Sequence, residues 1–275
     1  MLPTETDVKQ LNRTLGKTET YIHHQLMKKG SIHIALLDPD KTTESKAGEV
    51  AQICENAGTS LLMIGGSLGI TQDQLDTFVK TLREASKLPI ILFPSNISGL
   101  TPYADAVWFM SLLNSENNYY ITGAQALGAP LVKRYKLEAI PLSYIIVGAG
   151  GAAGYIGQAR PIPYDRPEII AAYSLAGEYL GMRFVYLEAG SGAGEPVPER
   201  VIHLVRMAIN SPIIVGGGIR SGEDAKKSCR AGASIIVTGT TIEESEKNDL
   251  ADKLADIVNG VEEGYSSRKE NPASK

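Results

Sequence analysis

Two short apolar runs near the end of the chain, PIIVGGG at 212–218 and SIIVTGT at 234–240, decide the fold. Both are rich in β-branched residues and lack polar alternation, a pattern typical of strands buried on both faces of a parallel sheet. Six further runs of this kind precede them, at 31–38, 60–66, 89–94, 106–113, 143–150 and 183–190. The sequence therefore predicts eight buried strands.

Amphipathic stretches lie between most of these strands and predict helices. The segment up to about Lys29 predicts one or two further helices, which end at Gly30. The clearest helical stretches between strands are 43–57, 71–87, 166–180, 198–210, 221–231 and 242–258. Eight strand and helix units in 275 residues indicate an α/β fold of the (β/α)8 TIM barrel type, with a doubly wound parallel sheet as the main alternative. We expect one barrel domain over 1–262 with an N-terminal helix, and a disordered polar tail over 263–275.

Composition and charge exclude several classes of protein. The 27 basic and 31 acidic residues give a net charge of -4, which is not the electrostatic pattern of a nucleic-acid binder. Cys54 and Cys229 are far apart and have no histidine pair nearby, so neither a zinc site nor a disulfide is expected. Residues 1–19 lack the pattern of a secretory signal, and the most apolar stretch, 140–156, is too short and too glycine-rich to span a bilayer. We expect a soluble, cytoplasmic protein with at most peripheral membrane contact.

The ends of the last two strands predict a phosphate site. The active site of such a barrel lies at the carboxyl ends of its strands. The seventh strand ends in Gly216, Gly217 and Gly218, and the eighth ends in Gly239 and Thr240. Glycines let backbone N–H groups approach a phosphate closely, and the loops after strands seven and eight bind phosphate in many barrels. The alternative is that these glycines only form tight turns.

The end of the sixth strand, at Tyr186 to Gly194, supplies a carboxylate. Strand alternation places Tyr186 and Glu188 on one side and Leu187 on the other. At the barrel mouth, Glu188 could bind the hydroxyl groups of a polyol and act as a general base. The alternative is a structural ion pair with an arginine at the rim.

The ends of the first two strands predict a site for a hard cation. The sequence DPDK at 38–41 ends the first strand, and GGS at 65–67 ends the second. Asp38 could hold Mg²⁺ together with a diphosphate, and the hydroxyl of Ser67 could bind the metal or a phosphate; the alternative for DPDK is an Asx turn. The sequence lacks GxGxxG after the first strand and lacks a P-loop, which argues against dinucleotides and nucleoside triphosphates, whereas FMN stays possible.

Several of these motifs together resemble one family. They are DPDK at 38–41, GGS at 65–67, PLSYIIVGAGGAAGYIG at 141–157, YLEAGSG at 186–192 and IIVGGGIRSGEDA at 213–225. The sequence resembles the geranylgeranylglyceryl phosphate synthase family, which also includes heptaprenylglyceryl phosphate synthases. Leu36 stands where bacterial members often have lysine, which favours the archaeal-type branch. The resemblance implies a TIM barrel prenyltransferase that uses Mg²⁺ to join sn-glycerol 1-phosphate to geranylgeranyl diphosphate, the first ether step of archaeal membrane phospholipid synthesis.

The resemblance also implies roles for individual residues. Asp38 and Ser67 would bind Mg²⁺, and Glu188 and Asp38 would be catalytic. Thr240 stands where some members have asparagine, so its contact is expected through the backbone N–H. A homo-oligomer, either a dimer or an assembly of dimers, is expected. The implied substrate-binding residues are Tyr186, Leu187, Glu188, Ala189, Gly190, Ser191, Gly192, Gly217, Gly218, Gly239 and Thr240.

A C20 chain requires a long apolar groove. Candidates for its lining are Val107, Trp108 and Phe109, with the glycine- and alanine-rich segment after Val147, and residues 148–157 could form a lid. Trp108 either limits the length of the prenyl chain or is an ordinary core residue. Three alternative functions stay open: the same reaction with a longer prenyl donor, an FMN- or phosphosugar-binding barrel enzyme, and a binding protein without catalysis.

Overall fold

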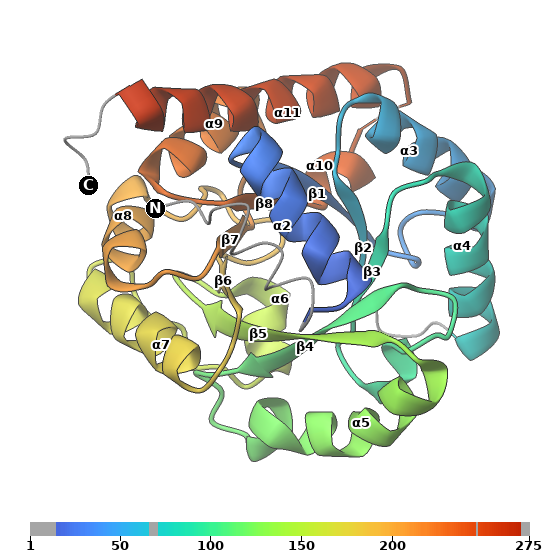
Figure 1. Cartoon of the computed structure of the whole chain (residues 1–275), viewed down its shortest axis with the longest axis horizontal. Helices are drawn as coiled ribbons and strands as arrows, with labels where there is room; N and C mark the ends of the chain where they lie inside the picture. Colours follow the sequence, from blue (N-terminus) through green and yellow to red (C-terminus); the bar gives the residue numbers. More distant parts are fainter. Residues whose placement is uncertain (1–14, 66–70, 246, 271–275) are drawn as a thin grey trace.

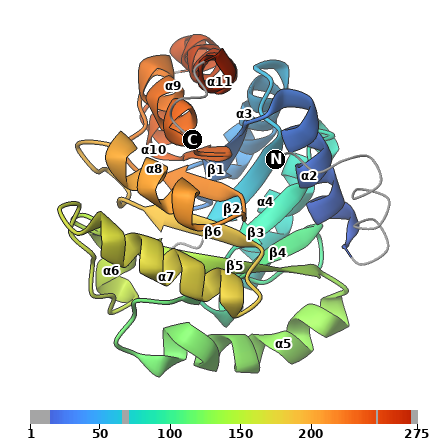
Figure 2. The ribbon, with the colours of Figure 1, turned by 60° about the vertical axis from the view of Figure 1, so that its left-hand side comes forward.

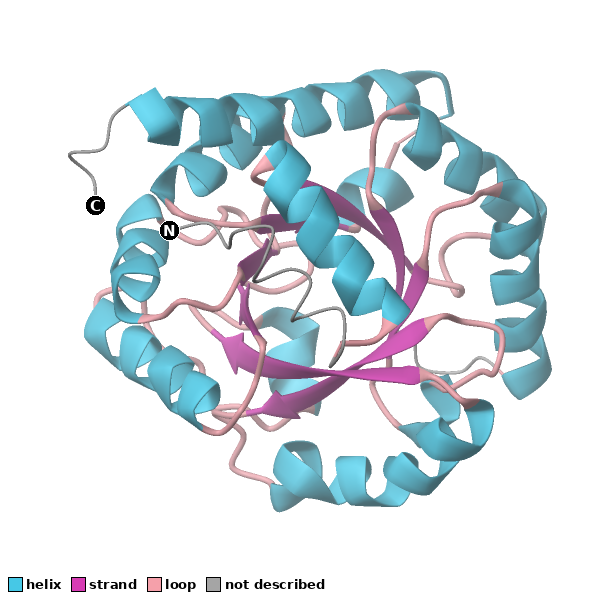
Figure 3. Ribbon diagram, in the orientation of Figure 1, coloured by secondary structure: helices cyan, strands magenta, loops and turns pink. Residues whose placement is uncertain are grey.

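The computed structural model describes residues 15–65, 71–245 and 247–270. In this part of the chain, eight parallel strands pair in sequence order, and β1 pairs with β8 to close a barrel. Figures 1 and 3 show the strands as an inner ring surrounded by helices. The closed order confirms the TIM barrel and excludes the doubly wound sheet, which has open edges. The strands are β1 (Ile32–Leu37), β2 (Leu61–Gly65), β3 (Ile90–Phe93), β4 (Ala106–Leu112), β5 (Glu138–Ile146), β6 (Phe184–Glu188), β7 (Ile213–Gly216) and β8 (Ile235–Thr238).

Helices connect the strands and form the outer layer. Residues 94–102 and 148–163, between strands, contain only short helices, η1 (Ile97–Gly99) and α6 (Gly151–Ile156). No helix within the described ranges is both long and apolar enough to cross a membrane. The helices are α2 (Lys17–Lys29), α3 (Glu44–Asn56), α4 (Gln72–Ala85), η1 (Ile97–Gly99), η2 (Tyr119–Gly123), α5 (Ala124–Tyr135), α6 (Gly151–Ile156), α7 (Pro167–Tyr179), α8 (Glu199–Ala208), α9 (Gly222–Ala231), α10 (Thr240–Glu243) and α11 (Lys247–Glu270).

Each strand divides its side chains between two cores. On β4, Trp108 and Leu112 belong to the core inside the barrel. Val107 belongs to the core between the strands and the helices, and Phe109 packs against that outer core. This alternation is the pleat of the strand, and it decides which residues can reach the mouth of the barrel.

Helix α2 closes the amino end of the barrel, as Figures 1 and 2 show. Ile22 and Leu26 of this helix are buried in the core inside the barrel. The carboxylate of Glu138, at the start of β5, accepts hydrogen bonds from the backbone N–H groups of Thr18 and Glu19 in the first turn of α2. These bonds satisfy donors that the helix itself leaves unpaired, and the carboxylate lies at the positive end of the helix dipole.

The last helix extends beyond the predicted end of the domain. Helix α11 continues to Glu270, so the prediction of a disordered tail is wrong for residues 263–270. The reason is close packing of α11 against α9. A Cβ atom on Gly260 would lie 2.0 Å from the carbonyl oxygen of Gly222, and one on Gly264 would lie 2.4 Å from that of Lys226. The two glycines, four residues apart, face α9 and let the helices approach, while the ring of Tyr265 is buried.

Candidate active site

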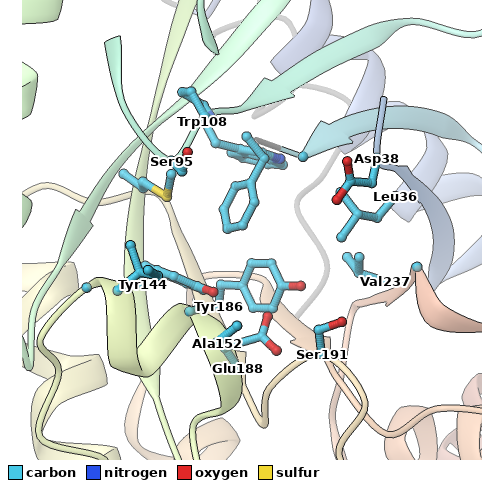
Figure 4. A pocket seen from close by; sticks show the side chains of 18 of the residues that line it. Leu36, Asp38, Ser95, Trp108, Tyr144, Ala152, Tyr186, Glu188, Ser191 and Val237 are labelled. Atoms are coloured by element: carbon cyan, nitrogen blue, oxygen red, sulfur yellow. The ribbon is translucent and has the colours of Figure 1, made fainter. Parts of the chain in front are cut away.

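A cavity of about 540 Å³ opens at the carboxyl end of the barrel, and every strand contributes lining residues at or near its end. It contains Asp38 after β1, Phe93 at the end of β3, and Glu188 at the end of β6. It also extends sideways between β4 and α5, where Val107 and Val132 line it. Figure 4 shows Asp38 and Glu188 on different walls of this cavity. The cavity therefore combines the predicted site at the mouth of the barrel with an apolar side groove.

Glu188 is a buried carboxylate to which none of the described residues supplies a cationic partner. Its side chain is 7% exposed, and its Oε1 accepts a hydrogen bond of 2.7 Å from the backbone N–H of Gly190. Burial raises the pKa of Glu188, although hydrogen bonds from Gly190, Tyr186 and Tyr144 act in the opposite direction. Among the described residues, no lysine, arginine or histidine forms an ion pair with Glu188. The alternative of a structural arginine partner is therefore wrong.

Two phenols donate hydrogen bonds to Glu188. Tyr144 on β5 and Tyr186 on β6 are adjacent in the strand register, and both face the cavity. Burial, together with the negative charge of Glu188, raises the pKa of both hydroxyls well above 10. Both hydroxyls therefore stay protonated at neutral pH and keep donating to the carboxylate. Tyr186 was predicted from the sequence and Tyr144 was not, although the inward position of Tyr144 follows from the alternation of β5.

Glycines bring the loops after β6 and β7 into contact. Gly217 has a φ of +85°, and a Cβ atom there would lie 2.6 Å from the carbonyl oxygen of Gly190 and 3.0 Å from Oε1 of Glu188. No other residue fits at this position, because a side chain would clash with both groups. The hydroxyls of Ser191 and Thr240 lie 3.4 Å apart, which joins the loop after β6 to the start of α10 after β8. The ends of β6, β7 and β8 therefore form one concave glycine surface of the cavity.

Asp38 lies on another wall of the cavity and forms an Asx turn, which was the alternative given for the DPDK sequence. Its Oδ1 accepts a hydrogen bond of 3.0 Å from the backbone N–H of Asp40, which is an Asx turn. The same turn places Lys41, whose Nζ lies 2.7 Å from Oε2 of Glu243 on α10. Burial raises the pKa of Asp38, with smaller opposing effects from the Asp40 N–H and Lys41. Asp38 is therefore both a turn residue and a cavity residue.

The structure brings most of the predicted site residues to this cavity, but not all of them. Leu187 and Ala189 belong to the core between the strands and the helices, so their side chains face away from the cavity. Gly190 lies behind the wall, where it packs against Gly151 and donates to Glu188. Ser67 lies outside the described residues. The predicted residues that line the cavity are Asp38, Tyr186, Glu188, Ser191, Gly192, Gly217, Gly218, Gly239 and Thr240.

The three groove candidates on β4 are divided between two faces. Val107 and Phe109 line the side groove, because they point out of the barrel toward α5. Trp108 points into the barrel, is 1% exposed, and packs edge to face on Phe184 with ring centroids 5.0 Å apart. It forms the floor of the cavity. Val107 and Phe109 thus line the side groove, whereas Trp108 lies beneath the mouth of the barrel.

The residues present fit a hard cation shared with a substrate. No group of three or more carboxylate, histidine or cysteine side chains gathers anywhere in the described ranges, so the protein alone offers no complete metal cage. Asp38, however, presents a carboxylate at the cavity wall. Mg²⁺ is commonly held by one or two carboxylates together with substrate phosphates and water. A single carboxylate such as Asp38 would therefore fit an ion of this kind if substrate oxygens and water supplied the other ligands.

Comparison with known proteins places the chain in a family. Residues 24–260 match the model of the PcrB family. Over 248 residues, the chain is 54% identical to geranylgeranylglyceryl phosphate synthase from Pyrococcus furiosus and 52% identical to that from Pyrococcus abyssi, covering 90% of this chain and 98% of each relative. The crystal structure of (S)-3-O-geranylgeranylglyceryl phosphate synthase from Thermoplasma acidophilum, in complex with sn-glycerol-1-phosphate, is 37% identical with a TM-score of 0.84, covering 88% of this chain and 98% of that one. The chain therefore belongs to the PcrB family, among the geranylgeranylglyceryl phosphate synthases, as the sequence motifs predicted.

Proposed function

We propose that this protein is a Mg²⁺-dependent prenyltransferase. It joins the 3-hydroxyl of sn-glycerol 1-phosphate to geranylgeranyl diphosphate and releases diphosphate. The observation that carries the proposal is the position of Glu188, buried without a cation and directly beside the glycine turn at Gly217. A carboxylate next to backbone N–H donors suits a molecule with hydroxyl groups at one end and a phosphate at the other.

The concave glycine surface would bind the phosphate of the acceptor. Gly218, Thr240 and Arg220 line this part of the cavity, and the backbone N–H groups of Gly218 and Thr240 would donate to phosphate oxygens. Bound in this way, the glycerol part extends toward Glu188. The carboxylate of Glu188 then accepts the proton of the 3-hydroxyl as that oxygen attacks. Its raised pKa makes it a better proton acceptor than an ordinary glutamate.

Asp38 would hold Mg²⁺ on the opposite wall, with Ser67 as the expected second ligand from the sequence. When bound, the ion would neutralise negative charge on the diphosphate and so make it a better leaving group. Lys41 follows Asp38 in the same turn, where its charge is paired with the carboxylate of Glu243. The separation of Asp38 from Glu188 suits a displacement in which the leaving group and the nucleophile lie on opposite sides of the reacting carbon.

The side groove between β4 and α5 would take the prenyl chain. Its walls include Val107, Phe109, Val132 and Leu100, which are apolar and partly or fully buried. Burying the chain there removes it from water and fixes its first carbon at the barrel mouth. Residues of α6, within the predicted lid at 148–157, line the cavity beside the mouth.

The protein would act as a homo-oligomer with at most peripheral membrane contact. Helices α7 and α8 expose Ile169, Tyr173, Leu204 and Met207, which are large apolar side chains on neighbouring helices. Such a face is typical of contacts between subunits. A sedimentation measurement that gave only monomers at micromolar concentration would contradict this part of the proposal.

A radiolabel transfer assay tests the reaction. Purified protein is incubated with Mg²⁺, labelled geranylgeranyl diphosphate, and sn-glycerol 1-phosphate or its enantiomer. We expect an organic-soluble product with the sn-1 enantiomer, and no product when EDTA is added. Donors from C15 to C35 are compared in the same way, and a clear preference for a longer donor would identify the related heptaprenyl reaction instead. Absence of product with every donor would overturn the proposal.

A further inference from the structure

Three aromatic rings pack together at the mouth of the barrel. Phe93 ends β3, and its ring lies 5.1 Å from that of Tyr144 and 5.5 Å from that of Tyr186, centroid to centroid. The two tyrosine rings lie 5.3 Å apart. All three line the cavity, with the tyrosines buried and Phe93 half-buried. The proposed roles of Glu188, Asp38 and the glycine turns leave the ring of Phe93 without a function.

Phe93 ends a strand that lies, in the barrel order, between the strand before Asp38 and the strands that carry Tyr144 and Tyr186. In the strand register its Cα is paired with that of Gly65, the last residue of β2, which is the neighbour of β1 and of Asp38. Its ring contacts Tyr186 and Tyr144, whose hydroxyls donate to Glu188. The ring therefore lines the cavity beside the wall that would hold the acceptor hydroxyl, on a strand between that wall and Asp38.

The proposed reaction places the reacting carbon between Asp38 and Glu188, in the cavity that Phe93 also lines. This step rests on the proposed function. The bond between C1 of the prenyl chain and the diphosphate oxygen breaks, and its electron pair leaves with the diphosphate. The bond between C1 and the 3-oxygen of glycerol phosphate forms, and the hydroxyl proton passes to Glu188. Because C1 is allylic, positive charge develops on it before the new bond is complete.

We propose that the ring of Phe93, packed against Tyr144 and Tyr186, stabilises the positive charge that develops on C1. An aromatic face attracts a cation through its quadrupole. Unlike a carboxylate, a phenyl ring is a poor trap for a reactive carbon, so it does not compete with the acceptor hydroxyl. Phe93 is therefore assigned as a catalytic residue that contacts the reacting atoms, and not only as a wall of the groove.

Fluorination of the ring separates this role from packing. Phe93 is replaced by 4-fluoro-, 3,5-difluoro- and 3,4,5-trifluorophenylalanine, and single-turnover transfer rates are measured with saturating geranylgeranyl diphosphate, sn-glycerol 1-phosphate and Mg²⁺. Each fluorine weakens the negative face of the ring while the ring stays apolar and nearly the same size. We expect the logarithm of the rate to fall stepwise, by roughly ten-fold over the series. The melting temperature and the affinity for sn-glycerol 1-phosphate should not change.

The same series at Phe184 is the matched control. That ring packs on Trp108 and His23 toward the closed end of the barrel and does not line the cavity. Its fluorination should leave the transfer rate unchanged. A flat series at Phe93, or an equal fall at Phe184, would overturn the inference while leaving the proposed reaction intact. Absence of product from the wild-type protein would overturn the proposed function itself, and the inference with it.

Discussion

Glu19 and Glu188 are both buried carboxylates, but they lie at opposite ends of the barrel and have opposite pKa shifts. Burial acts to raise the pKa of Glu19, yet the two hydrogen bonds from Arg183, its charge and the nearby imidazole of His23 lower it below its usual range. Nε and Nη2 of Arg183 lie 2.5 and 2.7 Å from the two oxygens of Glu19. Glu188 has only neutral donors, and burial raises its pKa.

Strand β6 connects the two sites and shows what the difference means. Arg183 comes directly before this strand, and Glu188 is its last residue. At the amino end, the charge of Glu19 is matched, so that carboxylate holds α2 onto the barrel. At the carboxyl end, the charge is unmatched and faces a cavity, so it can take a proton from a ligand. In this protein, a buried carboxylate indicates reactivity only where no cationic side chain is paired with it.

The largest effect is expected for Glu188→Gln. This change removes the proposed proton acceptor while keeping the shape of the side chain, so kcat should fall by about 10²- to 10⁴-fold. Because the folded protein raises the pKa of Glu188, its ionised form opposes folding at neutral pH, and the variant should be at least as stable as the wild type. Transfer rates and urea unfolding measure the two effects. An active variant with reduced stability would place Glu188 with Glu19 as a structural residue.

Asp38→Asn should give the next largest loss. The amide keeps the hydrogen bond from Asp40 that forms the turn, but it loses the charge for Mg²⁺. We expect turnover to fall by about 10²- to 10³-fold, with the melting temperature nearly unchanged. Titration with Mg²⁺ provides the check, because the variant should need a higher concentration for half-maximal rate. A wild-type rate and an unchanged Mg²⁺ dependence would contradict the assignment of Asp38.

Glu19→Gln should have the opposite profile. Removing the charge opposite Arg183 should lower the free energy of unfolding by about 1–3 kcal/mol at pH 7, a reduced figure because Arg183 is 41% exposed. Since folding lowers the pKa of Glu19, its contribution is present above the unfolded pKa and is lost as the pH falls through the folded value. Urea unfolding at pH 7 and pH 3 should therefore show the variant and the wild type converging. The rate per folded molecule should be unaffected. A thousand-fold loss of rate would contradict the assignment of a structural role to Glu19 and a catalytic role to Glu188.

The smallest effect is a shift in the pH dependence of the rate. Glu188 must be ionised to accept a proton, and its raised pKa places the acid limb of kcat above pH 4.5. The hydroxyl of Tyr144 stabilises the ionised form, so Tyr144→Phe should raise that pKa further and move the limb to higher pH. The measurement is a pH-rate profile between pH 4 and 8 for both proteins. A shift to lower pH would mean that Tyr144 does not donate to Glu188.

Local patterns were enough to predict the barrel and the parts of the site that lie close together in sequence. The β-branched runs gave seven strands to within about two residues, because such residues favour buried parallel strands. Strand β5 instead begins at Glu138, five residues before the predicted start. Pro141 interrupts the pattern, but pairing with β4 extends the strand. The predicted alternation is also confirmed: Tyr186 and Glu188 face the cavity, and Leu187 faces the outer core.

Features that depend on distant neighbours could not be predicted in this way. The contact of Phe93 with Tyr144 and Tyr186 joins strands that are far apart in sequence, and no local pattern indicates which rings meet. The helical residues 263–270 look polar in sequence, and only the packing of Gly260 and Gly264 on α9 explains why they are ordered. In both cases the deciding partner lies on another element of the fold.

The most direct test of the account is a crystal structure of this protein with sn-glycerol 1-phosphate. We predict that the phosphate oxygens accept hydrogen bonds from the backbone N–H groups of Gly218 and Thr240. We also predict that a glycerol hydroxyl lies within hydrogen-bond distance of the carboxylate of Glu188. A ligand that bound elsewhere, or one with its hydroxyls turned away from Glu188, would contradict the claim that the unmatched carboxylate at the mouth of the barrel is the reactive one.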